Sequence, residues 1–228
     1  MGKAIDKIKN IKIVKTLSNI GKIEDLRQRI LVTLMLVAVY RFGSYVVLPG
    51  IDTEALTGVQ NQTSTGLMSL LDMFSGGAFS KASIFALGIM PYISASIVMQ
   101  LLGIAVPYFQ KMQREGESGR RKMNQYTRYL TIFILLLQAP SYLLNLKWQN
   151  GGLNPMHESL DWTWFVVSST IILTAGSMFV LWLGERITDK GIGNGISLII
   201  MIGIIARFPQ AFIQEFTTRF TTPGQGGL

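Results

Sequence analysis

The stretch Ala86-Leu-Gly-Ile-Met-Pro-Tyr-Ile-Ser-Ala-Ser96 lies inside an apolar run, residues 84–106, that is long enough to span a membrane as a helix. It nevertheless contains a glycine, a proline and two serines near the middle of that run. Transmembrane helices tolerate such residues where neighbouring helices satisfy the freed backbone groups. The alternative is that this helix lines a water-filled path, and the rest of the chain has to distinguish the two.

The composition of the whole chain is that of an integral membrane protein. Of its 228 residues, 49% are hydrophobic and 15% are charged, whereas about 25% are charged in an average soluble domain. We therefore predict an all-α polytopic membrane protein with five transmembrane helices. The apolar runs expected to form them are residues 30–47, 84–106, 129–146, 162–183 and 196–213.

Lysine and arginine are distributed unevenly among the segments that connect these runs. They gather before the first run, between the second and third, and between the fourth and fifth, which all lie on one side if each run crosses once. The opposite loops contain only Lys81 and Lys147. The positive-inside rule then places the N-terminus in the cytoplasm. Residues 1–29 are basic and amphipathic, and lie either on the inner leaflet or as a solvated tail.

The segment between the first two runs differs from an ordinary external loop. Residues 66–74 favour an apolar helix of about one third of a membrane thickness, and Ser75, Gly76 and Gly77 break it. Such a helix is either re-entrant, with irregular backbone buried in protein or lining water, or an ordinary helix on the surface of the loop.

Two pairs of isoleucines stand four residues apart, so that each pair shares one face of a helix. Ile89 pairs with Ile93 and Ile196 with Ile200, each after a break rich in small residues. On spacing alone, such pairs pack against other helices far more often than they line a pore. Gln100, farther along the second run, is costly in lipid without a protein or water partner.

The sequence lacks the residue patterns of enzymes and metalloproteins. It has no cysteine and one histidine, His157, and no nucleophile or paired carboxylate suggests a catalytic constellation. The glycine-rich loop 191–195 lacks the strand and the Lys-Ser/Thr tail of a phosphate-binding loop. Only Arg41 and Arg207 are ionisable candidates at membrane depth, which weakens the case for an ion-coupled transporter. No enzymatic activity, metal or cofactor is expected.

A basic cluster lies in the segment between the second and third runs, residues 111–128. Arg120, Arg121 and Lys122 either anchor the topology or form a docking surface for an acidic or phosphate-bearing partner.

Several long motifs, in the right order, resemble the SecY family of bacterial protein-conducting channels. They are Tyr40-Arg-Phe-Gly-Ser44, Leu48-Pro-Gly-Ile-Asp52, Asp72-Met-Phe-Ser-Gly-Gly-Ala78, the opening stretch extended back to Lys81, Glu115-Gly-Glu-Ser-Gly-Arg-Arg-Lys-Met-Asn-Gln-Tyr-Thr-Arg-Tyr129 and Trp182-Leu-Gly-Glu-Arg-Ile-Thr-Asp-Lys-Gly-Ile-Gly-Asn-Gly-Ile-Ser197.

The resemblance implies roles for the unusual segments. Residues 66–78 resemble the plug that seals the outer funnel, the isoleucine pairs match positions of the hydrophobic pore ring, and the second and third runs resemble one wall of the lateral gate. The residues implied are, for the plug, Leu67, Leu70, Leu71, Met73, Phe74, Ser75, Gly76 and Gly77; for the ring, Ile89, Ile93, Ile196 and Ile200; for the gate, Ser94, Ser96, Gln100 and Thr127; and for partner docking, Arg120, Arg121 and Lys122.

The resemblance covers the first half of the family's ten-helix inverted-repeat fold. Residues 30–213 would form this five-span half, and residues 214–228 would trail toward a missing second half, which implies a fragment. The implied partners are small SecE-like and SecG-like membrane subunits, a SecA-like motor ATPase, the ribosome, preprotein substrates and membrane lipid. The implied location is the bacterial cytoplasmic (inner) membrane.

The function implied is that of the central subunit of a translocation channel. Such a channel passes unfolded preproteins across the membrane and releases transmembrane segments laterally into lipid, without bond chemistry of its own. The alternative from the sequence is an independent half-channel-like carrier or assembly factor.

Overall fold

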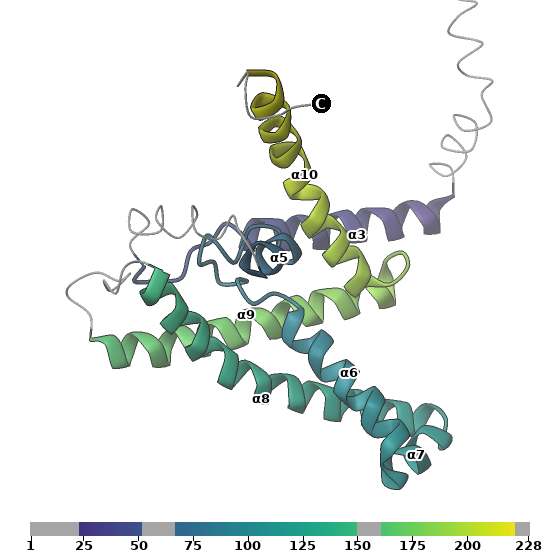
Figure 1. The fold of residues 1–228 in the computed structure, drawn as a ribbon. Coiled ribbons are helices and arrows are strands. Elements are labelled where there is room, and N and C mark those ends of the chain that lie inside the picture. The colour runs from purple at the N-terminus through teal and green to yellow at the C-terminus, as the bar shows by residue number, and fades with distance from the viewer. Residues whose placement is uncertain (1–22, 52–66, 150–160, 222–228) are drawn as a thin grey trace, which may run out of the picture.

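The structure is a computed structural model that describes residues 23–51, 67–149 and 161–221. These residues form seven helices joined by turns (Figure 1). The helices are α3 (Glu24–Gly43), α5 (Leu67–Phe74), α6 (Met90–Ala105), α7 (Pro107–Arg114), α8 (Glu117–Gln149), α9 (Trp162–Lys190) and α10 (Gly195–Thr221). The amphipathic stretch within residues 1–22 and His157 lie outside the described residues.

The described part of the chain is helical throughout its regular structure, as predicted, and two of its helices are long and apolar enough to cross a membrane. These are α8 and α9, and α6 with α7 adds a third if this pair, bent by 98°, is one span. The apolar part of α10, Gly195–Pro209, is shorter. Length and composition therefore support two or three of the five predicted spans.

The second apolar run is the one whose helix differs most from its prediction. Instead of being helical from residue 84, the chain runs through buried turns until Ile89, and α6 begins at Met90. Gly88 has a φ of +53°, which a helix cannot use, and Pro91 lies in the first turn of α6, where its missing N–H has no helical partner to lose. The glycine and proline thus stand at a helix boundary and do not interrupt a helix.

The other runs keep their helices with shifted ends. The helix α3 starts before the first run and ends at Gly43, so residues 44–47 are not helical, and the helix α9 continues to Lys190. The segment 111–128 is mostly helical, because it contains the end of α7 and the start of α8. Gly119 allows the start of α8 to lie close to the end of α7, since a Cβ atom there would overlap the carbonyl oxygen of Met112.

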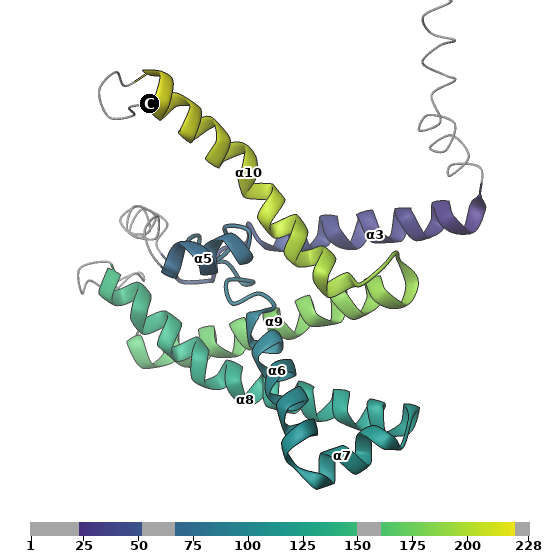
Figure 2. The ribbon, with the colours of Figure 1, turned by 45° about the vertical axis from the view of Figure 1, so that its right-hand side comes forward.

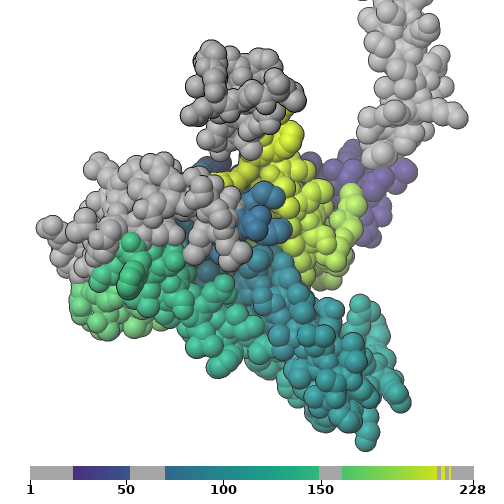
Figure 3. Space-filling model, in the orientation of Figure 1, coloured from purple at the N-terminus to yellow at the C-terminus, as the bar shows by residue number. Residues whose placement is uncertain are grey.

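The helices pack around two apolar clusters. In Figures 1 and 2, α8 and α9 lie against each other, α6 packs against α8, and α10 extends away from the other helices. One cluster joins residues 79–87 to α8 and α9. The other joins α3, residues 85–93, α9 and α10. α7 and the first turns of α8 project as a tip (Figure 3).

Gly176 on α9 is needed to accommodate the buried turn segment. A Cβ atom at this position would overlap the backbone carbonyl oxygen of Ile84. We expect Gly176→Val to lower the free energy of unfolding by about 1–3 kcal/mol, because overpacking forces the backbone to move. Thermal unfolding in detergent measures this, with Ala175→Val, on the exposed face of the same helix, as the control. Equal losses in the two variants would contradict the packing described here.

Candidate functional site

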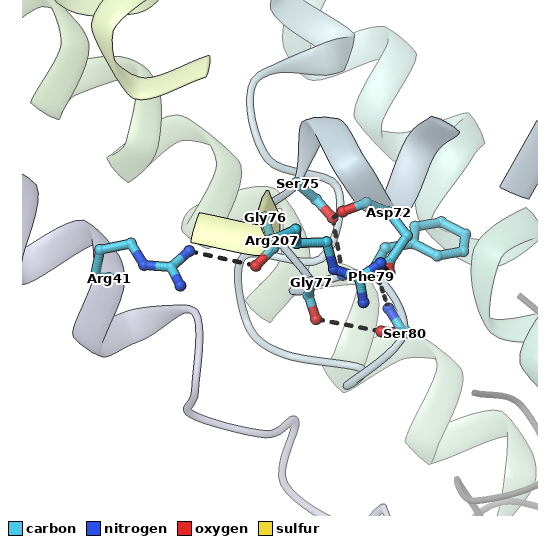
Figure 4. A network of polar contacts seen from close by, with 8 residues as sticks. All are labelled: Arg41, Asp72, Ser75, Gly76, Gly77, Phe79, Ser80 and Arg207. Atoms are coloured by element: carbon cyan, nitrogen blue, oxygen red, sulfur yellow. Dashed lines mark hydrogen bonds and ion pairs between the residues drawn. The ribbon is translucent and has the colours of Figure 1, made fainter. Parts of the chain in front are cut away.

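The short helix α5 ends where the sequence predicts, and a tight turn follows it. Gly76 and Gly77 have φ angles of +66° and +88°, which favour glycine. Two side chains then organise the turn (Figure 4). The Ser75 hydroxyl oxygen accepts from the backbone N–H of Phe79 at 3.1 Å, and the Asp72 carboxylate accepts from that of Ser80 at 2.8 Å.

Three long helices hold this turn from outside. From α3, Arg41 donates to the Gly76 carbonyl at 3.3 Å. From α8, the Tyr142 hydroxyl donates to the Phe79 carbonyl at 2.8 Å. From α10, the guanidinium of Arg207 forms an ion pair with Asp72, whose side chain is only 2% exposed. Arg41 and Arg207, the two ionisable residues noted in apolar runs, therefore both bind the turn after α5.

The backbone of α10 also lies directly against this turn. A Cβ atom built on Gly203 would be 3.0 Å from the carbonyl oxygen of Phe74, and one on Gly76 would be 3.0 Å from the Cα of Gly203. Both distances are shorter than most Cβ contacts, so a side chain at either position would push the two backbones apart. Glycine at 76 and 203 therefore lets α5 and α10 meet backbone to backbone.

The buried backbone after the turn is paired with the segment that follows α3. The N–H of Leu48 donates to the Ala82 carbonyl at 2.9 Å, and the N–H of Ile84 donates to the Val46 carbonyl at 2.9 Å. These bonds flank an antiparallel bridge between Val47 and Ser83. Buried backbone groups need hydrogen-bond partners, and here neighbouring backbone provides them.

The structure brings the four isoleucines of the implied ring together. Ile89 is buried in the second cluster, and Ile93, Ile196 and Ile200 pack against it. The cluster draws on the start of α6 and the start of α10, so residues more than 100 apart in sequence meet. A groove of about 370 Å³ continues along α10 beside it. Its lining residues are Ser197, Ile200, Met201, Ile204 and Ile205.

The glycine-rich loop before α10 sets where that helix begins. Asn194 caps it, because its side-chain oxygen accepts from the backbone N–H groups of Ile196 and Ser197 at 3.1 and 3.3 Å. The N–H of Ile192 donates to the Thr33 hydroxyl at 3.2 Å, which ties the loop to α3. A Cβ atom at Gly195 would overlap the carbonyl oxygen of Gly184, so this glycine lets the loop pack against α9 and positions the start of α10.

The four implied gate residues make their hydrogen bonds within their own helices. On α6, Ser94 donates to the Met90 carbonyl and Gln100 to the Ser96 hydroxyl, both at 3.2 Å. Thr127 on α8 is buried and donates to the Met123 carbonyl at 2.9 Å. Ser94 and Gln100 are exposed, so α6 presents polar groups along an otherwise apolar surface.

The implied docking residues lie at the start of α8, on the projecting tip. Arg120, Arg121 and Lys122 are all exposed. Arg121 lies 3.8 Å from Glu117, and Lys122 lies 3.6 Å from Glu115. Exposed pairs of this kind hold a side chain only weakly, so the cations remain available to a partner.

Comparison with known proteins assigns the chain to a family. A family model described as SecY matches residues 83–226. The chain belongs to the SecY family. SecY proteins similar to it, each described as a protein translocase subunit, come from Buchnera aphidicola (Schizaphis graminum), Aquifex aeolicus and Escherichia coli, with identities of 45%, 42% and 44%.

These alignments cover 90%, 86% and 84% of this chain, and 45%, 46% and 43% of the respective relatives. The chain thus spans about half the length of the SecY relatives it matches.

Sequence reasoning missed the contacts that unite the site. Arg207 was noted as an unusual charge, but its partner Asp72 lies more than 130 residues earlier. A signal was available, since an acidic residue in the apolar α5 and a basic residue in an apolar run each need a counter-charge. Tyr142 gave no such signal, because tyrosines occur widely in membrane helices.

Tyr142→Phe tests the support that α8 gives to the turn. The substitution removes the 2.8 Å bond to the buried Phe79 carbonyl, which keeps the bond from the Ala82 N–H at 3.2 Å, and we expect a loss of about 0.5–1.5 kcal/mol in unfolding free energy. Thermal unfolding in detergent measures it. Tyr129→Phe, on the exposed part of the same helix, should unfold like the wild type, and a Tyr142→Phe variant that does the same would contradict the assigned contact.

Proposed function

We propose that this chain forms one half of a protein-conducting channel in the bacterial cytoplasmic membrane. The channel passes unfolded preproteins across the membrane and releases apolar segments sideways into lipid. The proposal rests on one observation: α5 with its buried turn, and the isoleucine cluster, both contact the same helix, α10. Membership of the SecY family supports it.

In this proposal the four isoleucines form one side of a closed ring. A constriction lined by large apolar side chains gates by excluding water, and therefore ions. An extended polypeptide displaces such side chains without breaking strong polar contacts. The helix α5 and its turn form the plug beside this ring, and α6 and α8 form one wall of the lateral gate, with Ser94, Ser96, Gln100 and Thr127 as its polar residues.

The proposed topology has five crossings, made by α3, α6, α8, α9 and α10, with the N-terminus in the cytoplasm. The projecting tip then lies in the cytoplasm, where Arg120, Arg121 and Lys122 contact a SecA-like motor or the ribosome. SecE-like and SecG-like subunits complete the complex. The chain carries out no bond chemistry, and the energy for transport comes from the motor or from the ribosome.

Photo-crosslinking at Ile93 tests the path directly. A photoreactive amino acid replaces Ile93 in the complete translocon, and a preprotein is arrested in transit by a folded C-terminal domain. We expect an adduct between position 93 and the preprotein. The control is Val98, which is exposed on α6 and lies about 140° around the helix from position 93.

An adduct at position 98 but not at position 93 would contradict the proposal. The isoleucines would then be ordinary packing residues, and an independent carrier or assembly factor would become the better explanation.

Cysteine labelling at the two ends of α8 tests the topology. The chain has no cysteine, so Arg121→Cys and Trp148→Cys each introduce a single thiol at an exposed position. A membrane-impermeant maleimide should label position 148 in intact spheroplasts and position 121 only in inverted vesicles. Labelling of both positions from the same side would contradict the proposed crossing.

A further inference from the structure

The ion pair between Arg207 and Asp72 joins two parts of the molecule with different proposed tasks. Asp72 belongs to α5, and its side chain is 2% exposed, whereas Arg207 lies on α10 with its side chain 36% exposed (Figure 4). Within the described part of the chain, Arg207 is the only side chain that forms an ion pair with Asp72. The remaining contact of the carboxylate, from the Ser80 N–H, lies within the same turn.

This arrangement makes the position of α5 depend on that of α10. A buried carboxylate left without its counter-charge is strongly unfavourable, because the surroundings solvate it poorly. The contacts of Gly203 with Phe74 and Gly76 add close packing at the same place. A movement of α10 that withdraws the guanidinium would therefore leave the buried carboxylate without its counter-charge.

The same helix also carries half of the proposed ring. Arg207 follows Ile200 by seven residues, about two helical turns or 10 Å along α10. A shift of α10 that separates Ile196 and Ile200 from Ile89 and Ile93 therefore also moves Arg207 relative to the turn.

We infer that Arg207 is a positioning residue that latches the proposed plug in the closed state through its ion pair with Asp72. The inference rests on the proposed function. Because the latch is electrostatic, its loss should loosen the seal without removing the path itself. Arg41 bonds a neutral carbonyl of the same turn and contributes orientation without neutralising the carboxylate.

The test uses the complete translocon in lipid vesicles and measures two quantities for each variant: ion leak without substrate, and uptake of a preprotein. Arg207→Gln and Asp72→Asn each remove one partner, and their double variant removes both. Arg207→Lys keeps the charge. Lys81→Gln, which removes a neighbouring positive charge that contacts the Tyr45 ring, is the matched control.

We expect Arg207→Gln and Asp72→Asn each to raise the leak about tenfold or more while preprotein uptake continues. The double variant should leak no more than either single variant, because one interaction is lost in all three. Arg207→Lys and Lys81→Gln should stay within about twofold of the wild-type leak. Thermal unfolding of each purified variant identifies any that misfolds. If Arg207→Gln misfolds, the ion leak of Asp72→Asn and of Arg207→Lys decides the outcome.

Two outcomes separate this inference from the function on which it rests. If the variants that remove the ion pair leak no more than the wild type and take up preprotein normally, the latch is wrong and the channel function stands. Failure of the wild-type complex to take up any preprotein would overturn the channel itself.

Discussion

The structure depends on one constraint, which is that the backbone from Ser75 to Ile89 is buried without being helical. Each of its N–H and C=O groups needs a partner, because an unpaired group in an apolar interior is costly. The partners come from four directions: the turn's own Ser75 and Asp72, Arg41 on α3, the segment after α3, and Tyr142 on α8. The long helices around this segment are placed so that they can supply these contacts.

The need to accommodate this buried segment also explains the glycines that lie in it and beside it. Gly176 on α9 leaves room for backbone where a side chain would collide, Gly203 on α10 allows a close approach, and Gly76 and Gly77 adopt the left-handed conformations that turn the chain after α5. This solution is compact but has only moderate strength, since it uses a few hydrogen bonds and one ion pair. The proposed channel requires such a segment to be released when one of its neighbours moves.

Sequence reasoning predicted the helical class and the short helix before Ser75, because hydrophobic length and glycine breaks are local signals. Of the five spans that it predicted, helix length and composition support two or three. It also selected four isoleucines that the structure brings into one cluster, although family resemblance, and not their spacing, led to that choice. It misplaced the start of α6 by six residues, because an apolar composition alone does not distinguish a buried turn from a helix. The charges of Asp72 and Arg207 signalled that each needs a partner, but which partners meet, and the bond from Tyr142, depend on how distant helices cross.

The central claim is that α5 with its turn, and the isoleucine cluster, form a closed path that a polypeptide opens. A cryo-electron microscopy structure of the complete translocon with an arrested preprotein tests this most directly. The account predicts density for an extended chain bordered by Ile89, Ile93, Ile196 and Ile200, and a turn at Gly76 and Gly77 that no longer touches α10. Preprotein density elsewhere, with Asp72 still paired to Arg207, would contradict it.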